Sequence, residues 1–504
     1  MVVDIRRSQI IWWTAVAAAA LAGLGLRIAA AQGGLWTDEA WSMIYAAEAR
    51  DAAGVFLRIN HDNNHHLYSL WLQTIGMQAP PWLARVPAIV SGSASIVVAA
   101  LLARRWSARA GFIAAVLFAL SPAMVTFGAE ARGYAPMLLA ALVMLLLVTR
   151  ALERGWGRST PWLIAGVAAF GMLSQMTMAA PVGLVSLWVY LESRAAAGPS
   201  AGLRQATQLM GPALGATVAV VAFVFGAAAA SPTGMRLGGY VPFDWPDYGL
   251  ALDDLAGWTL GVSGIARWLG PLLIAGAAAL LAWRPPAWLG SRARLYALLI
   301  LGVPVAVALV HPGNAAFSRY YLSSALGLLL LAAEWIGRGL ATQGALRMVA
   351  TTALATALFV ALRHDRDLIQ SEHGQPEQAV ALIARQTPQG ARVALEPERL
   401  QGIVATAAAE TGYNIEIVDG CASAGFVLAS RLRFARPPKT LVRCGVAMRA
   451  IGAGSGTALT GDYWVLYAEP LAAGRLQTAG PPVSGRVPGG RDGRLSGRAG
   501  VAQG

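Results

Sequence analysis

Long apolar blocks recur along the first 362 residues and leave this chain few ways to fold. They lie at residues 10–31, 82–102, 110–128, 134–150, 161–175, 178–192, 210–230, 268–283, 295–311, 320–340 and 345–362. Most are long enough to cross a hydrocarbon core of about 30 Å. Because lipid offers the backbone no hydrogen-bond partner, such segments are helical unless they close a barrel. The sequence therefore predicts an all-α polytopic membrane protein, with roughly eleven transmembrane helices within 1–362.

Charge is scarce and unevenly placed. Only 13% of the 504 residues are charged and 56% are hydrophobic, whereas about 25% of a soluble domain is charged. Arginines gather in alternate connections between the apolar blocks: Arg6 and Arg7; Arg104, Arg105 and Arg109; Arg150, Arg154 and Arg158; Arg194 and Arg204; Arg284, Arg292 and Arg294; Arg338 and Arg347. This asymmetry is typical of cytoplasmic loops and places the N-terminus in the cytoplasm. It also explains the net charge of +13 without nucleic acid as a partner.

The C-terminal part differs from the rest of the chain. An odd number of spans puts it outside the cytoplasm, so we predict a bacterial inner-membrane protein with a periplasmic C-terminal part. At 363–470, short strands ("GARVAL", "GFVLAS", "YWVLYAE") and the amphipathic helix "PEQAVALIARQ" predict a small α/β domain. Residues 471–504, rich in Gly, Pro, Ser and Arg, are predicted to be disordered. We expect the first apolar run, too long for a signal peptide, to be retained.

Both cysteines, Cys421 and Cys444, lie in the predicted C-terminal domain. In an oxidising periplasm such a pair can form a disulfide. Two unpaired buried thiols are the alternative, and neither cysteine has the spacing of a zinc site.

The first outer loop, at about 32–80, is long and polar and contains "TDEAWS" and "INHDNNHHLYSLWL". Its aromatic residues favour a position at the membrane–water boundary. There the adjacent carboxylates Asp38 and Glu39 could accept a proton from a membrane-bound substrate. The alternative is helix capping, with Thr37 as N-cap and the acidic pair in the first turn. The two interpretations are compatible.

Two further outer connections carry arginines. In "GAEARGYAP", Arg132 lies between Glu130 and Tyr134, and its fork suits a pair of phosphate oxygens. An internal ion pair with Glu130 or Asp38 is the alternative. In "HPGNAAFSRYYL", Arg319 precedes Tyr320 and either contacts a phosphate or snorkels to the membrane surface.

The loop at 231–267 is long enough to form a lid, or it serves as a passive connector.

No phosphate-loop, GxSxG or HExxH motif is present. A divalent metal held by Asp38, Glu39 and His65 is one hypothesis for the acidic loop. Because adjacent histidines point in different directions, we expect His65 and His66 rather to bind substrate or the carboxylates.

These motifs, in this order, resemble those of the GT-C-fold membrane glycosyltransferases. They are most similar to the family 39 group of protein O-mannosyltransferases and lipid A aminoarabinose transferases. The shared elements are the acidic pair Asp38–Glu39, the "NHHLY" stretch with His65, His66 and Tyr68, the "EARGY" element with Glu130, Arg132 and Tyr134, and Arg319–Tyr320. In the family, two prolines occupy part of the histidine stretch, and both are missing here.

The resemblance implies transfer of a sugar from a polyprenyl-phosphate donor to an unknown lipid, glycan or protein acceptor, with inversion. It implies Asp38 as base with Glu39 orienting or assisting, and Arg132 and Arg319 at the donor phosphate. Glu130, Tyr134, Tyr320, Tyr68, His65 and His66 would then position or bind substrate. Some relatives use a divalent metal and others do not, and both alternatives stay open.

Other functions are weighed against this one. A lipid-linked saccharide flippase usually has internal repeats and charges within its spans, whereas no repeat is seen here and the polar residues lie in outer loops. An assembly subunit without enzymatic activity would have little use for the acidic pair.

Overall fold

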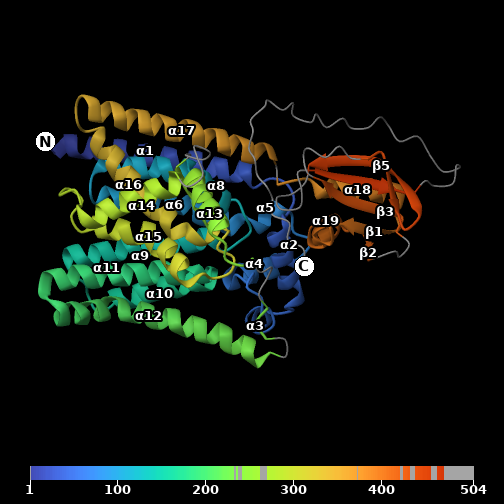
Figure 1. Ribbon diagram of the computed structural model, residues 1–504, viewed down its shortest axis with the longest axis horizontal. Helices are drawn as coiled ribbons and strands as arrows, with labels where there is room; N and C mark the ends of the chain where they lie inside the picture. Colours follow the sequence, from blue (N-terminus) through green and yellow to red (C-terminus); the bar gives the residue numbers. More distant parts are fainter. Residues whose placement is uncertain are drawn as a thin grey trace.

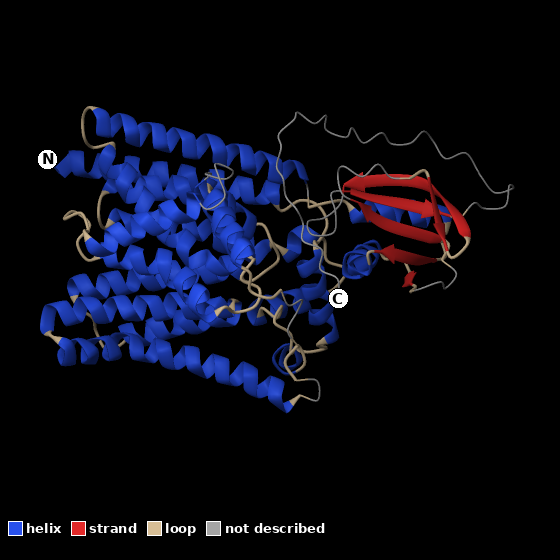
Figure 2. Ribbon diagram, viewed as in Figure 1, coloured by secondary structure: helices blue, strands red, loops and turns tan. Residues whose placement is uncertain are grey.

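The computed structural model describes residues 2–231, 234–236, 241–260, 269–371, 373–419, 424–431, 438–455 and 463–469. Within these, a helical bundle occupies one end of the molecule and a β-sheet with two helices the other (Figures 1 and 2). Cys421 and residues 471–504 lie outside the described residues, so the disulfide with Cys444 and the disordered tail stay predictions.

Helices lie at all eleven predicted apolar blocks. They are α1 (Val2–Ala30), α6 (Val86–Arg104), α7 (Ala108–Leu120), α9 (Tyr134–Arg154), α10 (Thr160–Ser174), α11 (Ala179–Ala197), α12 (Pro199–Ala230), α14 (Leu269–Trp283), α15 (Arg292–Val310), α16 (Leu322–Gly339) and α17 (Ala345–Ser371). Among the described residues, 7 helices are long and apolar enough to span a membrane, and shorter apolar helices accompany them. The chain is therefore a mostly helical, multi-span membrane protein.

The predicted span at 110–128 is not one continuous helix. It ends as α7 at Leu120 and resumes as α8 (Pro122–Phe127), because Pro122 cannot continue the hydrogen-bond ladder. The buried Arg27 of α1 donates to the carbonyl oxygens of Phe118 (3.0 Å) and Met124 (3.1 Å), beside this break. A guanidinium is suited to this position because it supplies several donors and no acceptor.

Short helices cover the end of the bundle nearest the sheet (Figure 1). In the predicted loop at 32–80 they are α2 (Thr37–Glu48), α3 (Ala52–Leu57) and α4 (His66–Ile75), and α5 (Pro81–Ala84) follows. The loop at 231–267 contributes α13 (Trp245–Leu260), and the 3-10 turn η2 (Ser318–Tyr321) precedes α16.

The C-terminal part is a mixed sheet of six strands. In spatial order they are β2 (Ile415–Ile417), β1 (Ala391–Glu396), β3 (Phe426–Arg431), β6 (Tyr463–Ala468), β5 (Val446–Ser455) and β4 (Thr440–Arg443). The pairs β1–β2 and β1–β3 are parallel and the others antiparallel. Helices α18 (Pro376–Gln386) and α19 (Gln401–Thr411) accompany it. The four elements predicted from the sequence correspond to β1, β3, β6 and α18.

The sheet region contacts the first loop of the bundle directly. The Gly34 amide donates to the Gly374 carbonyl at 3.1 Å, and a Cβ on Gly34 would come within 2.5 Å of Pro376. On α19, a Cβ on Gly402 would lie 3.3 Å from the Trp41 ring of α2. The Pro376 ring therefore lies so close to the Gly34 backbone that only glycine fits at this position.

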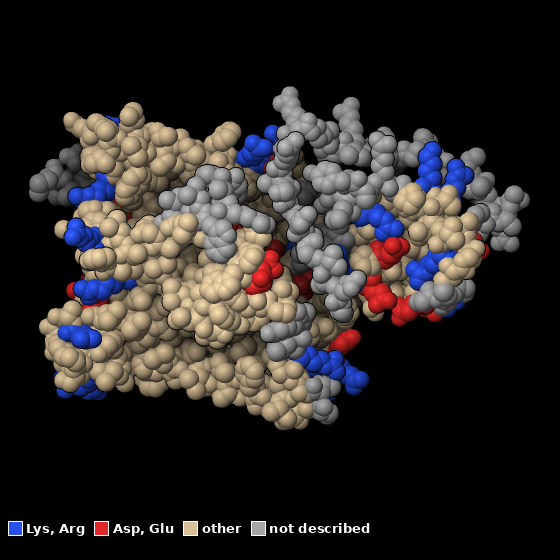
Figure 3. Space-filling model, in the orientation of Figure 1, with Lys and Arg blue, Asp and Glu red and all other residues tan. Residues whose placement is uncertain are grey.

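Surface charge differs between the two ends of the bundle. Figure 3 shows basic side chains at the end away from the sheet, and mixed acidic and basic side chains near the sheet. The wall between these ends carries little charge in this view, as expected where lipid surrounds the helices.

Candidate active site

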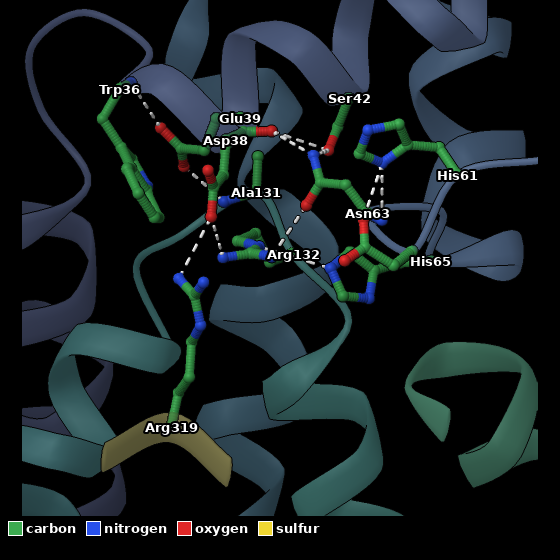
Figure 4. A network of polar contacts seen from close by, with 11 residues as sticks. Trp36, Asp38, Glu39, Ser42, His61, Asn63, His65, Ala131, Arg132 and Arg319 are labelled. Atoms are coloured by element: carbon green, nitrogen blue, oxygen red, sulfur yellow. Dashed lines mark hydrogen bonds and ion pairs between the residues drawn. The ribbon is translucent and has the colours of Figure 1, made fainter. Parts of the chain in front are cut away.

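Helix α2 presents the acidic pair in two directions. Its N-cap is Trp36 rather than the expected Thr37, and the Trp36 amide donates to Glu39 Oε2 at 3.1 Å. Consecutive residues on a helix project about 100° apart. Asp38 and Glu39 therefore enter different surroundings, as Figure 4 shows.

Glu39 is sealed inside the protein with Arg85, at the start of α6. The Arg85 Nε lies 3.0 Å from Glu39 Oε1, and its Nη2 lies 2.6 Å from Oε2. The remaining Arg85 donors reach the carbonyl oxygens of Ala31, Gly33 and Gly34 at 2.7–2.9 Å. Both side chains are 0% exposed. All five Arg85 donors are thereby used, which explains how an ion pair is tolerated here.

Glu39 also fixes the loop that carries Arg132, because its Oε1 accepts the Ala131 amide. Burial would raise the pKa of Glu39, but the Arg85 guanidinium and these hydrogen bonds lower it below its usual value. Glu39 is therefore an ionised anchor without access to solvent, and its place fits orientation of α2 rather than contact with a substrate.

Asp38 occupies the opposite kind of environment. Its Oδ2 atom lies 2.5 Å from Arg132 Nη1 and 3.1 Å from Arg319 Nη1 (Figure 4). The Asp38 side chain is 23% exposed and Arg319 21% exposed. Residues 94 and 281 positions away in sequence thus converge on one carboxylate oxygen.

Arg132 is held from several sides. Its Nη2 donates to Asn63 Oδ1 at 2.8 Å, and its Nε donates to His65 Nε2 at 3.3 Å. The guanidinium carbon lies 5.1 Å from the centre of the Tyr134 ring and 5.4 Å from that of Trp36. Within the described residues, three of its five N–H donors are engaged, which leaves two for an anion.

Asn63 ties this arginine to α2. Its Nδ2 donates to the Asp38 carbonyl and to Ser42 Oγ, each at 3.0 Å. The neighbouring His65 is buried, and burial together with the nearby Arg132 lowers its pKa well below the usual value. His65 is therefore neutral and can accept from Arg132 Nε.

The other predicted residues have less direct places. Tyr320 lies beside Arg319, whose guanidinium carbon is 5.6 Å from the centre of its ring. Glu130 is buried next to Arg132, and burial, with Glu39 nearby, raises its pKa to about 8. Tyr68 is buried and donates to the Ala84 carbonyl at 2.9 Å. This placement makes Tyr68 a link between α4 and α5 rather than a substrate contact. His66 is buried, and its ring stacks on Phe56 with the ring centres 5.3 Å apart.

The candidate metal ligands are not assembled. Glu39 is engaged by Arg85, and His65 directs Nε2 to Arg132. In the part of the chain that the structure describes, no three His, Cys, Asp or Glu side chains form a group suited to a metal ion. The residue set Asp38, Glu39 and His65 therefore does not fit a protein-bound metal.

Two site residues escaped the sequence analysis. Arg85, in "WLARVP", is a lone arginine at the start of an apolar block, and such a charge next to a span signals either snorkelling or a buried partner. Asn63 offers no such signal, because asparagine in a polar loop is ordinary.

Part of the sequence, and the fold, are similar to known proteins. Residues 64–225 match the family described as dolichyl-phosphate-mannose-protein mannosyltransferase. None of the curated protein sequences matches the chain significantly.

Solved structures with a similar fold include ArnT from Cupriavidus metallidurans. In the apo state its TM-score is 0.55 at 14% identity, covering 92% of this chain and 98% of that one. Bound to undecaprenyl phosphate, its TM-score is 0.52 at 14% identity, covering 91% and 98%. The oligosaccharyltransferase of Archaeoglobus fulgidus has a TM-score of 0.47 at 14% identity, covering 80% of this chain. This chain spans 62% of the length of that enzyme.

Fold and comparisons define a multi-pass membrane protein that is similar in fold to ArnT and resembles the GT-C glycosyltransferases over residues 64–225. Residues 64–225 carry the family named for mannose transfer from dolichyl phosphate, a polyprenyl phosphate. The resemblance predicted from the motifs is confirmed by this match and by the similar fold of ArnT.

Proposed function

We propose that this protein transfers a sugar from a polyprenyl phosphate to an acceptor at the periplasmic face of a bacterial inner membrane, with Asp38 as base. The supporting observation is the meeting of Asp38 with Arg132 and Arg319 on a single carboxylate oxygen. Two cations beside one base suit a reaction whose leaving group is a phosphate anion.

Both guanidinium groups bind Oδ2 of Asp38, and the second carboxylate oxygen, Oδ1, has lone pairs of its own that can take a proton. The donor phosphate carries oxygens that form the same charge-assisted hydrogen bonds with arginine. Donor binding draws Arg132 and Arg319 toward the phosphate and releases Asp38. The donor phosphate and Asp38 thus compete for the same two arginines.

The chemical step then follows. The acceptor oxygen attacks the anomeric carbon as its proton passes to Asp38, and the bond from that carbon to the phosphate oxygen breaks. The electron pair leaves with the phosphate, which the two arginines stabilise. Attack opposite the leaving group inverts the anomeric centre. One carboxylate is sufficient, since a phosphate leaving group needs no general acid.

Orientation is inferred from charge. The basic end of the bundle lies away from the sheet (Figure 3), and basic loops remain in the cytoplasm. The end that carries Asp38 and the C-terminal sheet then faces the periplasm. The similar fold of ArnT, solved with undecaprenyl phosphate bound, supports a lipid-phosphate donor.

Replacement of Asp38 by Asn tests the proposal. Purified protein in lipid, given polyprenyl-phosphate sugars and envelope glycolipid fractions, should transfer sugar about 10²–10⁴-fold more slowly as Asp38→Asn. The matched control is Asp247→Asn, in the first turn of α13, which should transfer normally. Normal transfer by Asp38→Asn would overturn the assignment of the base. Movement of donor lipid across the membrane without any transfer would favour a flippase instead.

A further inference from the structure

The arginines at the basic end of the bundle are satisfied in two ways. Three of them form ion pairs with glutamates, namely Arg105–Glu153, Arg292–Glu334 and Arg294–Glu192. Arg104, the last residue of α6, makes no side-chain hydrogen bond or ion pair among the described residues. Its guanidinium therefore keeps all five of its N–H donors, which lie in one plane.

Two tryptophans of α1 hold this guanidinium in place. Its carbon lies 4.0 Å from the centre of the Trp12 ring and 5.8 Å from that of Trp13. The two rings meet at 77°, with their centres 4.9 Å apart, so they form a corner beside the cation. A contact with a ring face orients the guanidinium but does not use its N–H donors. Arg104 is thus fixed while its donors stay available to an acceptor from outside the chain.

The first turn of α7 lies beside the two tryptophans. The Trp12 indole donates to the Ala108 carbonyl at 2.9 Å, and a Cβ on Gly111 would come within 2.9 Å of the Arg104 Cβ. Arg109, in the same turn, is exposed and makes no ion pair within the described residues. This surface therefore has two cations without a protein counterion. We call it the α1–α7 corner, and its residues are Trp12, Trp13, Arg104 and Arg109.

The α1–α7 corner lies where the bundle meets the membrane surface. Tryptophan favours the headgroup level of a bilayer, and Trp13 is 45% exposed. Beside it on α1, Ile10 is 66% and Ile11 61% exposed, which suits contact with acyl chains. The fork of a guanidinium matches a pair of phosphate oxygens. Basic clusters next to spanning helices bind anionic lipid headgroups in this way.

We propose that the α1–α7 corner binds the phosphate of an anionic phospholipid, through the guanidinium groups of Arg104 and Arg109. An anionic lipid is favoured over a zwitterionic one because the corner contains no carboxylate to hold a positively charged headgroup. Lipid binding here is independent of the proposed transfer reaction. The 19 residues of α6, about 28 Å at 1.5 Å per residue, separate Arg104 from the Arg85–Glu39 pair.

Native mass spectrometry tests the proposal on the full chain, purified in a neutral detergent and titrated with phosphatidylglycerol. The wild-type protein should bind the first lipid saturably, and more tightly than phosphatidylcholine with the same acyl chains. Arg104→Gln should weaken this binding about fivefold, the loss expected for one arginine at a lipid headgroup.

The matched control is Arg194→Gln, which removes the same charge from an exposed arginine near the end of α11. Figure 1 places α11 on the other side of the bundle from α1. This variant should bind phosphatidylglycerol as the wild-type protein does. Equal weakening in the two variants would show that diffuse charge attracts the lipid, and it would overturn the proposed site.

Three further outcomes would count against the proposal. They are the absence of saturable binding, equal affinity for the two phospholipids, and displacement of the lipid by millimolar inorganic phosphate, which would indicate a site for small anions instead. If Arg104→Gln does not fold, Arg109→Gln takes its place in the comparison. Normal lipid binding by that variant would then overturn the assignment.

Discussion

Two neighbouring carboxylates show how one sequence motif serves two purposes. Around Glu39 every charge is matched: Arg85 uses all its donors, and neither side chain meets solvent. Around Asp38 the charges are unequal, because two guanidinium groups share one partly exposed carboxylate. A matched environment holds structure in place, whereas an excess of positive charge invites an anion. The excess therefore marks the side on which donor phosphate should bind.

The largest expected effect is on stability and comes from removing Arg85, the partner of the buried Glu39. Arg85→Met leaves the Glu39 carboxylate buried and unpaired, which should cost about 3–5 kcal/mol of the free energy of unfolding. We expect a large fall in folded yield and in Tm, measured in detergent. The double variant Arg85→Met/Glu39→Gln should recover part of the loss. Arg294→Met, which removes an exposed pair with Glu192, is the control and should cost about 0–1 kcal/mol. If Arg85→Met and Arg294→Met lost the same free energy of unfolding, the buried pair would be no more important for stability than the surface pair.

Substitutions around Asp38 should lower the activity rather than the stability of the protein. Arg132→Lys keeps the charge but loses the fork that reaches Asp38, Asn63 and His65 at once. We expect kcat/KM for the donor to fall about 10²-fold, with a small change in Tm. Donor kinetics at fixed acceptor would show this. Unchanged kinetics would reduce Arg132 to a structural ion-pair residue.

The smallest expected effect is on the pH dependence of stability and concerns Glu130, which is near both Glu39 and Asp38. Its pKa is raised from 4.5 to about 8, so the folded state holds a proton that the unfolded state releases. Between these values the folded state binds more protons, and stability therefore falls as the pH rises. Glu130→Gln, which cannot ionise, should remove part of the decline in Tm between about pH 5 and pH 8. The exposed Glu398→Gln should leave that decline unchanged. A decline of the same size in Glu130→Gln would show that other groups cause it.

Much of the bundle could be predicted from sequence, because lipid forces an apolar block to become a helix. The interruption at Pro122 was not predicted, because a proline does not by itself show where a span breaks. Arg27, which donates to carbonyl oxygens beside the break, lies far away in sequence and meets it only in the packed structure. The approach of Asp38, Arg132 and Arg319 followed from the family resemblance, and their roles remain predictions. The separation of Asp38 from Glu39 required the position of Arg85, which no local pattern supplies. In the sheet, β2, β4, β5 and α19 were not predicted, since short segments gain their stability from neighbours.

The bond from the Gly34 amide to the Gly374 carbonyl joins residues 340 positions apart, beside the carbonyls that hold Arg85. During synthesis, a ribosome must therefore complete some three quarters of the polypeptide before this junction can close. Until then the segment that holds Arg85 and Glu39 lacks its contact with the C-terminal part. This junction therefore forms late in synthesis, after the bundle residues that it contacts have been made.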